Sequence, residues 1–164
     1  MSTFVLVHGA WHGAWCWYKI VAQLQAAGHR AIAPDLPGHG VDRTPVPEVT
    51  LDAYAERVCD TIAAQDEPVI LVGHSMGGGV ITAAAERCPD NIATLVYLTA
   101  ILTKDGQSMM EAADNPENPM SDSVTFDEAA GVGRVMDGKA RDLFYGLSPA
   151  EDVALAELAL LRGQ

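Results

Sequence analysis

The chain has 164 residues, 49% of them hydrophobic and 20% charged, which fits one globular domain with an ordinary core. Its formal net charge of −12 opposes phosphate backbones and anionic lipid surfaces, so neither nucleic acid nor a membrane is an expected partner. The first apolar run ends at His8, and no apolar stretch approaches the roughly 20 residues that span a bilayer, so we expect a soluble, cytoplasmic protein.

Apolar runs that alternate with helical patterns predict an α/β fold, a parallel sheet covered by helices on both faces. The expected strands are short and rich in Val, Ile and Leu, as strands buried on both faces should be: residues 4–7, 30–34, 69–72 and 92–98. The expected helices lie between them, at residues 17–27, 51–64 and 76–87, the second behind Thr50 as its N-cap. Right-handed crossovers then place the strands in one sheet, whose carboxyl end is the usual ligand-binding edge.

The character of the chain changes after the fourth expected strand. Residues 104–123 are polar and contain two Asn-Pro pairs, at 115–116 and 118–119, which predict an irregular segment. A helix is then expected behind a capping box of Thr125 and Glu128. Another is expected behind Ser148, with proline at its first position, and should run to about residue 162. Helices inserted here would lie over the ligand end of the sheet as a lid.

The five residues Gly73-His74-Ser75-Met76-Gly77 lie between the third expected strand and the helix that follows it. A strand that delivers a serine into a turn this sharp needs glycine two positions before and two positions after it. The hydroxyl then stands exposed at the end of the sheet. The pattern is a nucleophile elbow, and Ser75 is the predicted nucleophile.

The cysteines give no sign of a metal site or of a disulfide framework. Cys16, Cys59 and Cys88 form an odd, widely spaced set without metal-ligand spacing. We therefore expect three buried, unpaired thiols, in line with a reducing cytoplasm. No metal and no cofactor is expected.

Four segments resemble α/β-hydrolases, and within that fold the group of plant methyl esterases, hydroxynitrile lyases and their bacterial esterase relatives. They are FVLVHGAWHGAW at 4–15, GHR at 28–30 with DLPGHG at 35–40, the elbow, and SPAE at 148–151. The resemblance implies one structural domain with a three-layer core, residues 1–103, and a helical cap, residues 104–164. Relatives continue past the cap into two more strands that bear the catalytic carboxylate and histidine, and this sequence ends where the first of them should begin.

Two backbone amides are the expected stabilisers of negative charge. A serine hydroxyl that attacks an ester builds charge on the carbonyl oxygen, and two N–H groups about 3 Å away usually stabilise it. One is the amide of Met76, which directly follows the nucleophile in the first turn of a helix. The resemblance implies the amide of Ala10 as the other.

The resemblance also bears on the substrate. Lyase members carry threonine directly after the first-strand histidine, where this chain has Gly9, so ester hydrolysis ranks above cyanohydrin cleavage. The candidates for an apolar acyl or alcohol pocket, or else for core packing and contact between lid and sheet, are Trp11, Met109, Met110, Met120, Phe126, Phe144 and Tyr145.

In this fold the catalytic residues usually follow one another along the chain as serine, acid and histidine. No histidine follows His74 in this sequence, so that order does not identify the base that deprotonates Ser75. His12 and His39 lie in loops at the ligand end of the sheet and are the candidate surrogate bases. Structural, outward-pointing or solvated roles are expected for His8, His29, His74 and Asp105.

Two functions of different class fit these features. The first is a serine carboxylesterase that hydrolyses small or short-chain esters through an acyl-enzyme on Ser75. Its activity should be weak, since loss of the histidine costs about a million-fold while about a thousand-fold over water survives. The second is a catalytically impaired hydrolase that binds apolar ligands or a protein. The strand at 92–98 should be an exposed sheet edge, so a homo-oligomer is expected, joined there or through a lid helix.

Overall fold

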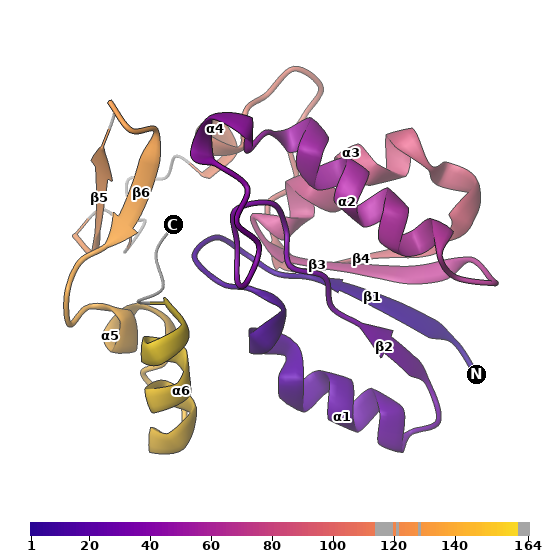
Figure 1. Cartoon of the computed structure of the whole chain (residues 1–164), viewed down its shortest axis with the longest axis horizontal. Helices are drawn as coiled ribbons and strands as arrows, with labels where there is room; N and C mark the ends of the chain where they lie inside the picture. The colour runs from indigo at the N-terminus through magenta and orange to yellow at the C-terminus, as the bar shows by residue number, and fades with distance from the viewer. Residues whose placement is uncertain (114–119, 121, 128, 161–164) are drawn as a thin grey trace.

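The described part of the chain, residues 1–113, 120, 122–127 and 129–160, forms in the computed structural model a four-stranded parallel sheet with a cap at one end (Figure 1). The strands follow the order β2-β1-β3-β4. Their bounds are Thr3–Val7 for β1, Arg30–Ile32 for β2, Val69–Ser75 for β3 and Ile92–Ala100 for β4. The predicted parallel sheet is confirmed, with β2 shorter and β3 and β4 longer than the apolar runs alone suggest.

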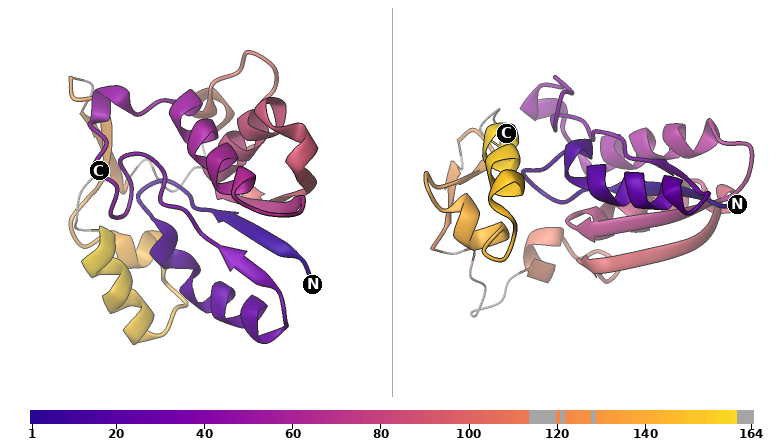
Figure 2. Two further views of the ribbon diagram at one scale, coloured as in Figure 1. Left: turned by 45° about the vertical axis from the view of Figure 1, so that its right-hand side comes forward. Right: turned by 90° about the horizontal axis from the view of Figure 1, so that it is seen from below.

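Helices cover both faces of the sheet, as the pattern predicts (Figure 2). Helix α1 covers one face, and helices α2 and α3 pack together on the other. Their bounds are Tyr18–Ala26, Leu51–Ala63 and Gly77–Arg87, with 3-10 turns at Ala14–Trp17, Val46–Glu48 and Pro89–Asn91. Thr50 caps α2 by accepting a hydrogen bond from the Ala53 amide at 3.1 Å. Among the described residues, no helix has the length and apolar character needed to cross a membrane.

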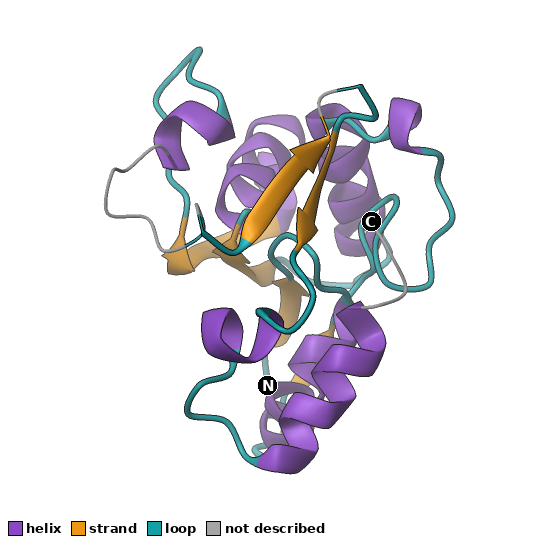
Figure 3. Cartoon of the chain, turned by 90° about the vertical axis from the view of Figure 1, so that its left-hand side faces the viewer, coloured by secondary structure: helices purple, strands orange, loops and turns teal. Residues whose placement is uncertain are grey.

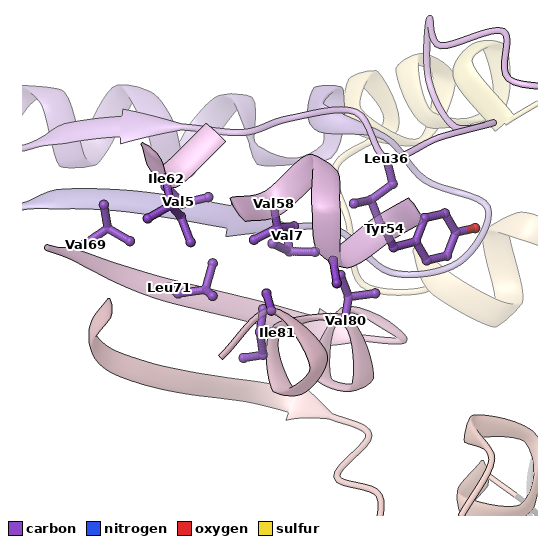
Figure 4. Close-up of a cluster of buried hydrophobic side chains, with 12 residues drawn as sticks. Val5, Val7, Leu36, Tyr54, Val58, Ile62, Val69, Leu71, Val80 and Ile81 are labelled. Carbon is purple, nitrogen blue, oxygen red and sulfur yellow. The ribbon is translucent and has the colours of Figure 1, made fainter. Parts of the chain in front are cut away.

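The core is built by strand residues that alternate between the two faces of the sheet. Val5 and Val7 of β1 face α2 and α3 and pack there with Val58 (Figure 4). Leu6, between them in the chain, faces the other way and packs with Trp17 on the α1 side. Because both faces are buried, the strand has no polar side, which explains why its sequence is continuously apolar.

A cap of helices and one β-hairpin lies beyond the carboxyl ends of the strands (Figures 1 and 3). Its elements are α4, Met109–Ala113; β5, Val124–Asp127; β6, Val132–Val135; α5, Ala140–Phe144; and α6, Ala150–Leu160. The predicted helix behind Ser148 is confirmed, although its expected end near residue 162 lies outside the described residues.

The helix predicted behind Thr125 is wrong, since the chain there forms strand β5 of the hairpin. Val124 pairs with Val135, and Asp127 pairs with Val132, in antiparallel register. Glu128, the other half of the expected capping box, lies outside the described residues. The capping pattern favours a helix here, whereas Val, Thr and Phe favour a strand. Pairing with β6 decides for the strand.

The segment predicted to be irregular also contains a short helix, α4. Ser108 accepts a hydrogen bond from the Glu111 amide at 3.1 Å, and the Glu111 carboxylate accepts one from the Ser108 amide at 2.8 Å. This is a reciprocal capping box that the sequence signalled and the prediction missed. The two Asn-Pro pairs fall in residues 114–119, which lie outside the described part of the chain.

The prediction of three unpaired thiols is wrong for two of them. Cys59 of α2 and Cys88 at the end of α3 form a disulfide, with their Cα atoms 6.1 Å apart. The pairing follows from the packing of α2 against α3, which the spacing of the cysteines does not reveal. Cys16 is unpaired, and burial raises the pKa of its thiol to about 12. The thiol argument for a reducing cytoplasm therefore no longer holds.

Candidate active site

Ser75 is the last residue of β3 and stands at the tip of a sharp turn into α3. Its φ of 53° is left-handed, a conformation that residues with a side chain rarely adopt. Glycines make the turn possible, because a Cβ on Gly73 would lie 2.5 Å from the Gly77 carbonyl oxygen. A Cβ on Gly77 would lie 2.8 Å from the carbonyl oxygen of Val7. The turn has the strand, strained serine and helix that define a nucleophile elbow.

The loop after β1 lies directly against this serine. A Cβ added to Gly9 would lie 2.9 Å from the Ser75 Cβ and 3.3 Å from the His74 carbonyl oxygen, so the loop packs directly on the elbow. The Ser75 carbonyl accepts a hydrogen bond from the Ile101 amide at 2.9 Å, which fixes the elbow to the chain after β4. Ser75 is partly exposed, and no group among the described residues hydrogen-bonds to its hydroxyl.

His8 orients the peptide that carries the Ala10 amide. Its Nδ1–H donates to the Gly9 carbonyl at 2.8 Å, and its Nε2 accepts from the Leu36 amide at 3.2 Å. In a trans peptide the C=O and the next N–H point in opposite directions, so a Gly9 carbonyl held by His8 turns the Ala10 N–H away from that ring. His8 is fully buried, and burial lowers its pKa to about 4, so the ring is neutral near pH 7.

The amides of Ala10 and Met76 have no internal acceptor within the described part of the chain. Met76 occupies the N-cap position of α3, where the first N–H groups of a helix and its positive dipole end are available to an anion. Both residues are partly exposed. Neither amide would therefore have to give up an internal hydrogen bond in order to bind an oxygen.

The next two residues of the loop contact the cap. Trp11 has a left-handed φ of 61°, and its indole N–H donates to the Gly133 carbonyl of β6 at 2.8 Å. The Nδ1–H of His12 donates to the Ala10 carbonyl at 2.8 Å, and its Nε2 accepts from the Tyr145 hydroxyl. Burial lowers the pKa of His12, so this ring is also neutral.

Asp35, which the sequence analysis did not single out, joins the loop after β1 to the loop after β2. One carboxylate oxygen accepts from the Ala14 amide at 2.6 Å, and the other accepts from the Val41 amide at 3.1 Å. Gly13 and Gly40 flank it so closely that a Cβ on either would lie within 2.7 Å of a carboxylate oxygen. The sequence contained a signal for this contact, namely Asp35 together with Gly13 and Gly40, but these residue types do not by themselves indicate a catalytic role.

His39, the other candidate base, lies in the core behind the loops. It is 6% exposed, its Nδ1–H donates to the Pro37 carbonyl at 3.0 Å, and its ring packs against Tyr54 and His8. Burial lowers its pKa. The structure does not bring His39 or His12 into hydrogen-bonding contact with Ser75 in the part of the chain that it describes.

The other titratable candidates have the surroundings expected for structural or solvated groups. The ring of His74 packs edge-on against Trp17, with centroids 6.4 Å apart. His29 accepts a hydrogen bond from the Ser2 amide and packs on Phe4, at the opposite end of the sheet from Ser75. Asp105 is exposed in a turn. Within the described residues, no three His, Cys, Asp or Glu side chains gather as metal ligands would.

The apolar pocket candidates divide into cap contacts and exposed side chains. The rings of Trp11 and Phe144 lie 6.0 Å apart, and Met109 lies against Gly79 of α3. Met110 and Phe126 are 64% and 59% exposed. Met120 is partly buried, and its carbonyl accepts from the amide that opens β5. Trp11, Phe144 and Tyr145 therefore connect the cap to the loop beside Ser75.

A parallel sheet that presents a strained serine at its carboxyl end, with a helix behind it and a capped loop beside it, defines the α/β-hydrolase class. The family model described as "Alpha/beta hydrolase family" matches residues 4–163, and the chain belongs to this family. This also confirms the resemblance drawn from the four sequence segments.

Several similar proteins are named as esterases. Esterase PIR7B of Oryza sativa subsp. japonica is 38% identical over 175 residues, which cover 98% of this chain and 65% of the relative. The carbendazim hydrolyzing esterase of a Nocardioides species is 46% identical over 112 residues, 67% of this chain and 46% of the relative. The crystal structure of the methylesterase MES16 from Arabidopsis matches with a TM-score of 0.79 at 31% identity, over 97% of this chain and 65% of that one. The chain thus spans about two thirds or less of the length of these relatives.

Proposed function

We propose that the protein is a serine carboxylesterase that hydrolyses small or short-chain carboxylic esters through an acyl-enzyme on Ser75. The observation that carries the proposal is the strained position of Ser75 beside the unengaged amides of Ala10 and Met76. The Ser75 oxygen attacks the ester carbonyl carbon while a base removes the hydroxyl proton. The two amides stabilise the oxyanion, the alcohol leaves with a proton, and water then hydrolyses the acyl-serine.

The surroundings of Gly9 support ester hydrolysis over cyanohydrin cleavage. A side chain at this position would begin 2.9 Å from the Ser75 Cβ and 3.3 Å from the His74 carbonyl oxygen. The present backbone therefore leaves no space for the threonine that lyase members carry there. The names of the relatives, an esterase, a carbendazim hydrolyzing esterase and a methylesterase, support the same class of substrate.

We propose His12 and His39 as the two candidates for the base within this chain. Each neutral ring has its Nδ1–H on a carbonyl, so its Nε2 is the basic nitrogen. In the described part of the chain the Nε2 of His39 has no hydrogen-bond partner, whereas the Nε2 of His12, which lies in the loop beside Ser75, already accepts the Tyr145 hydroxyl. Neither ring hydrogen-bonds to Ser75 in the described part of the chain, and removal of the histidine of a serine hydrolase costs about a million-fold, so slow turnover of activated esters is expected.

Hydrolysis of p-nitrophenyl acetate and butyrate tests the proposal. The 164-residue protein should hydrolyse both faster than its Ser75→Ala variant, and a fluorophosphonate should label Ser75. The rates of His12→Ala and His39→Ala with the same esters then show which ring serves as the base. Equal rates for the protein and Ser75→Ala, without labelling, would leave the alternative of a hydrolase fold that binds apolar ligands or a partner without chemistry.

We further propose that the 164-residue chain associates as a homodimer through β4 or the cap. Among the described strands, β4 pairs only with β3, and Val96 and Leu98 on it are 37% and 47% exposed. An unpaired strand edge with apolar side chains favours pairing with a second copy. Helix α6 is the alternative interface, since Val153 is buried within its own chain but Leu155 and Leu158 are 42% and 69% exposed. Sedimentation velocity at micromolar concentration should give a dimer, and a clean monomer would overturn this part of the proposal.

A further inference from the structure

We propose that the cap holds the loop after β1 in its working conformation, with Tyr145 and His12 as the positioning pair. The loop in question, residues 9–12, carries the Ala10 amide. This inference rests on the proposed role of that amide and goes beyond it, because it gives the cap a part in catalysis other than covering the site.

The loop needs support because its backbone is strained. Trp11 has a φ of 61°, and for a residue with a Cβ this left-handed conformation is unfavourable relative to the right-handed one. Strain of this kind persists only where surrounding contacts hold it. Because Trp11 directly follows Ala10, relaxation of its backbone would turn the peptide between Ala10 and Trp11, which adjoins the peptide that carries the Ala10 N–H.

Two separate parts of the cap supply contacts that hold this conformation. The hairpin accepts the Trp11 indole N–H at the Gly133 carbonyl, 2.8 Å away. Helix α5 places Phe144 against the same indole, with ring centroids 6.0 Å apart. Tyr145, at the end of α5, donates to His12. The cap therefore grips Trp11 and His12, the residues that directly follow Ala10.

The two hydrogen bonds of His12 depend on each other. Its ring can accept the Tyr145 hydroxyl at Nε2 only in the tautomer that carries its proton on Nδ1. In that tautomer Nδ1–H donates to the Ala10 carbonyl at 2.8 Å. The ring is also stacked on Trp15, with centroids 5.2 Å apart, so it cannot turn freely. Tyr145 thus selects the tautomer that holds the peptide following Ala10.

The ionisation states agree with this arrangement. Burial lowers the pKa of His12, so the ring keeps the lone pair that accepts the Tyr145 proton. Burial also raises the pKa of Tyr145, so its hydroxyl keeps the proton to donate. The other imidazoles whose charge would oppose protonation of His12 are His74 and His39, and burial lowers the pKa of each of them too.

The chain offers a matched control. Tyr18 of α1 donates its hydroxyl to Asp152 of α6, so it also links core and cap through a tyrosine oxygen, but it makes no hydrogen bond with residues 9–12 in the described part of the chain. Tyr145→Phe and Tyr18→Phe each remove one such oxygen and keep the ring. Only the first should affect the Ala10 amide.

The experiment compares the two variants in the 164-residue protein with p-nitrophenyl acetate. Removal of a whole oxyanion donor costs about a hundred- to a thousand-fold, so loosening one should lower kcat by about tenfold with little change in KM. Tyr18→Phe should leave both constants unchanged. In a His12→Asn background, Tyr145→Phe should have no further effect, because the two residues act through one bond.

Hydrogen exchange gives a readout that does not need activity. Peptides covering residues 8–12 should exchange faster in Tyr145→Phe than in the wild type or Tyr18→Phe. If the Tyr145→Phe protein exchanges residues 8–12 as slowly as the wild type does, the inference is overturned. A kcat of Tyr145→Phe equal to that of the wild type would overturn it too. The rate of Ser75→Ala tests the proposed function independently. If Ser75→Ala has the wild-type rate, the proposed function fails, and hydrogen exchange still decides the role of Tyr145.

Discussion

Replacing Gly77 with alanine should move the two proposed oxyanion donors apart. The new Cβ would lie 2.8 Å from the Val7 carbonyl oxygen and 2.9 Å from the His8 carbonyl oxygen, closer than real Cβ atoms approach. Both oxygens belong to the end of β1, which is held between β2 and β3, so α3 has to retreat. Met76 at the start of α3 retreats with it, and Ala10 stays with β1.

The size of the effect follows from that geometry. A displacement of about 1 Å at a catalytic group can cost about a hundred-fold in rate, and a retreat of a few tenths of an ångström should cost about tenfold in kcat. Overpacking in a core costs about 1–3 kcal/mol, so the free energy of unfolding should fall by a similar amount. Initial rates with p-nitrophenyl acetate and urea unfolding followed by circular dichroism measure the two effects.

Gly79→Ala in the same helix is the control. Its Cβ would lie 2.5 Å from the Met109 Sδ and 2.9 Å from its Cγ, but both atoms belong to a flexible side chain that can turn away, and no backbone atom of the described residues is in the way. Alanine inside a helix is favoured over glycine by about 0.5–1 kcal/mol, so stability should be kept or slightly raised. A Gly77→Ala protein that loses stability but keeps wild-type kcat would refute the role of the Met76 amide.

Two further predictions concern stability. Burial lowers the pKa of His8 from 6.5 to about 4. Between pH 6.5 and pH 4 the unfolded chain therefore binds more protons than the folded chain. Up to about 3 kcal/mol of the free energy of unfolding that is present above pH 6.5 should be lost as the pH falls to about 4. Urea unfolding across this range should show a shallower pH dependence in His8→Asn, and an unchanged dependence would contradict the assignment. The disulfide between Cys59 and Cys88 spans a sequence separation of 29, so its reduction should lower the free energy of unfolding by about 3.5 kcal/mol. Identical unfolding with and without dithiothreitol would show that the crosslink contributes nothing.

The elbow and the layered core could be predicted because their signals are local. Gly73, Ser75 and Gly77 lie within five consecutive residues, and the backbone contacts that exclude side chains at the glycines arise from the turn and the adjacent strand β1. Continuous runs of Val, Ile and Leu likewise predict buried strands wherever they occur. Such patterns indicate which backbone conformation the chain adopts over a few residues. Here they located the four strands of the parallel sheet, helices α1, α2, α3 and α6, and the proposed nucleophile.

What the sequence could not supply depends on contacts between distant residues. Thr125 lies in a strand rather than a helix because β6 pairs with it, and Cys59 meets Cys88 because α2 packs on α3. The partner of His12 is Tyr145, which is 133 residues away. Local composition favours a conformation by only a few tenths of a kcal/mol per residue. Burial and pairing across the folded chain outweigh that preference, so these features were decided by the tertiary structure alone.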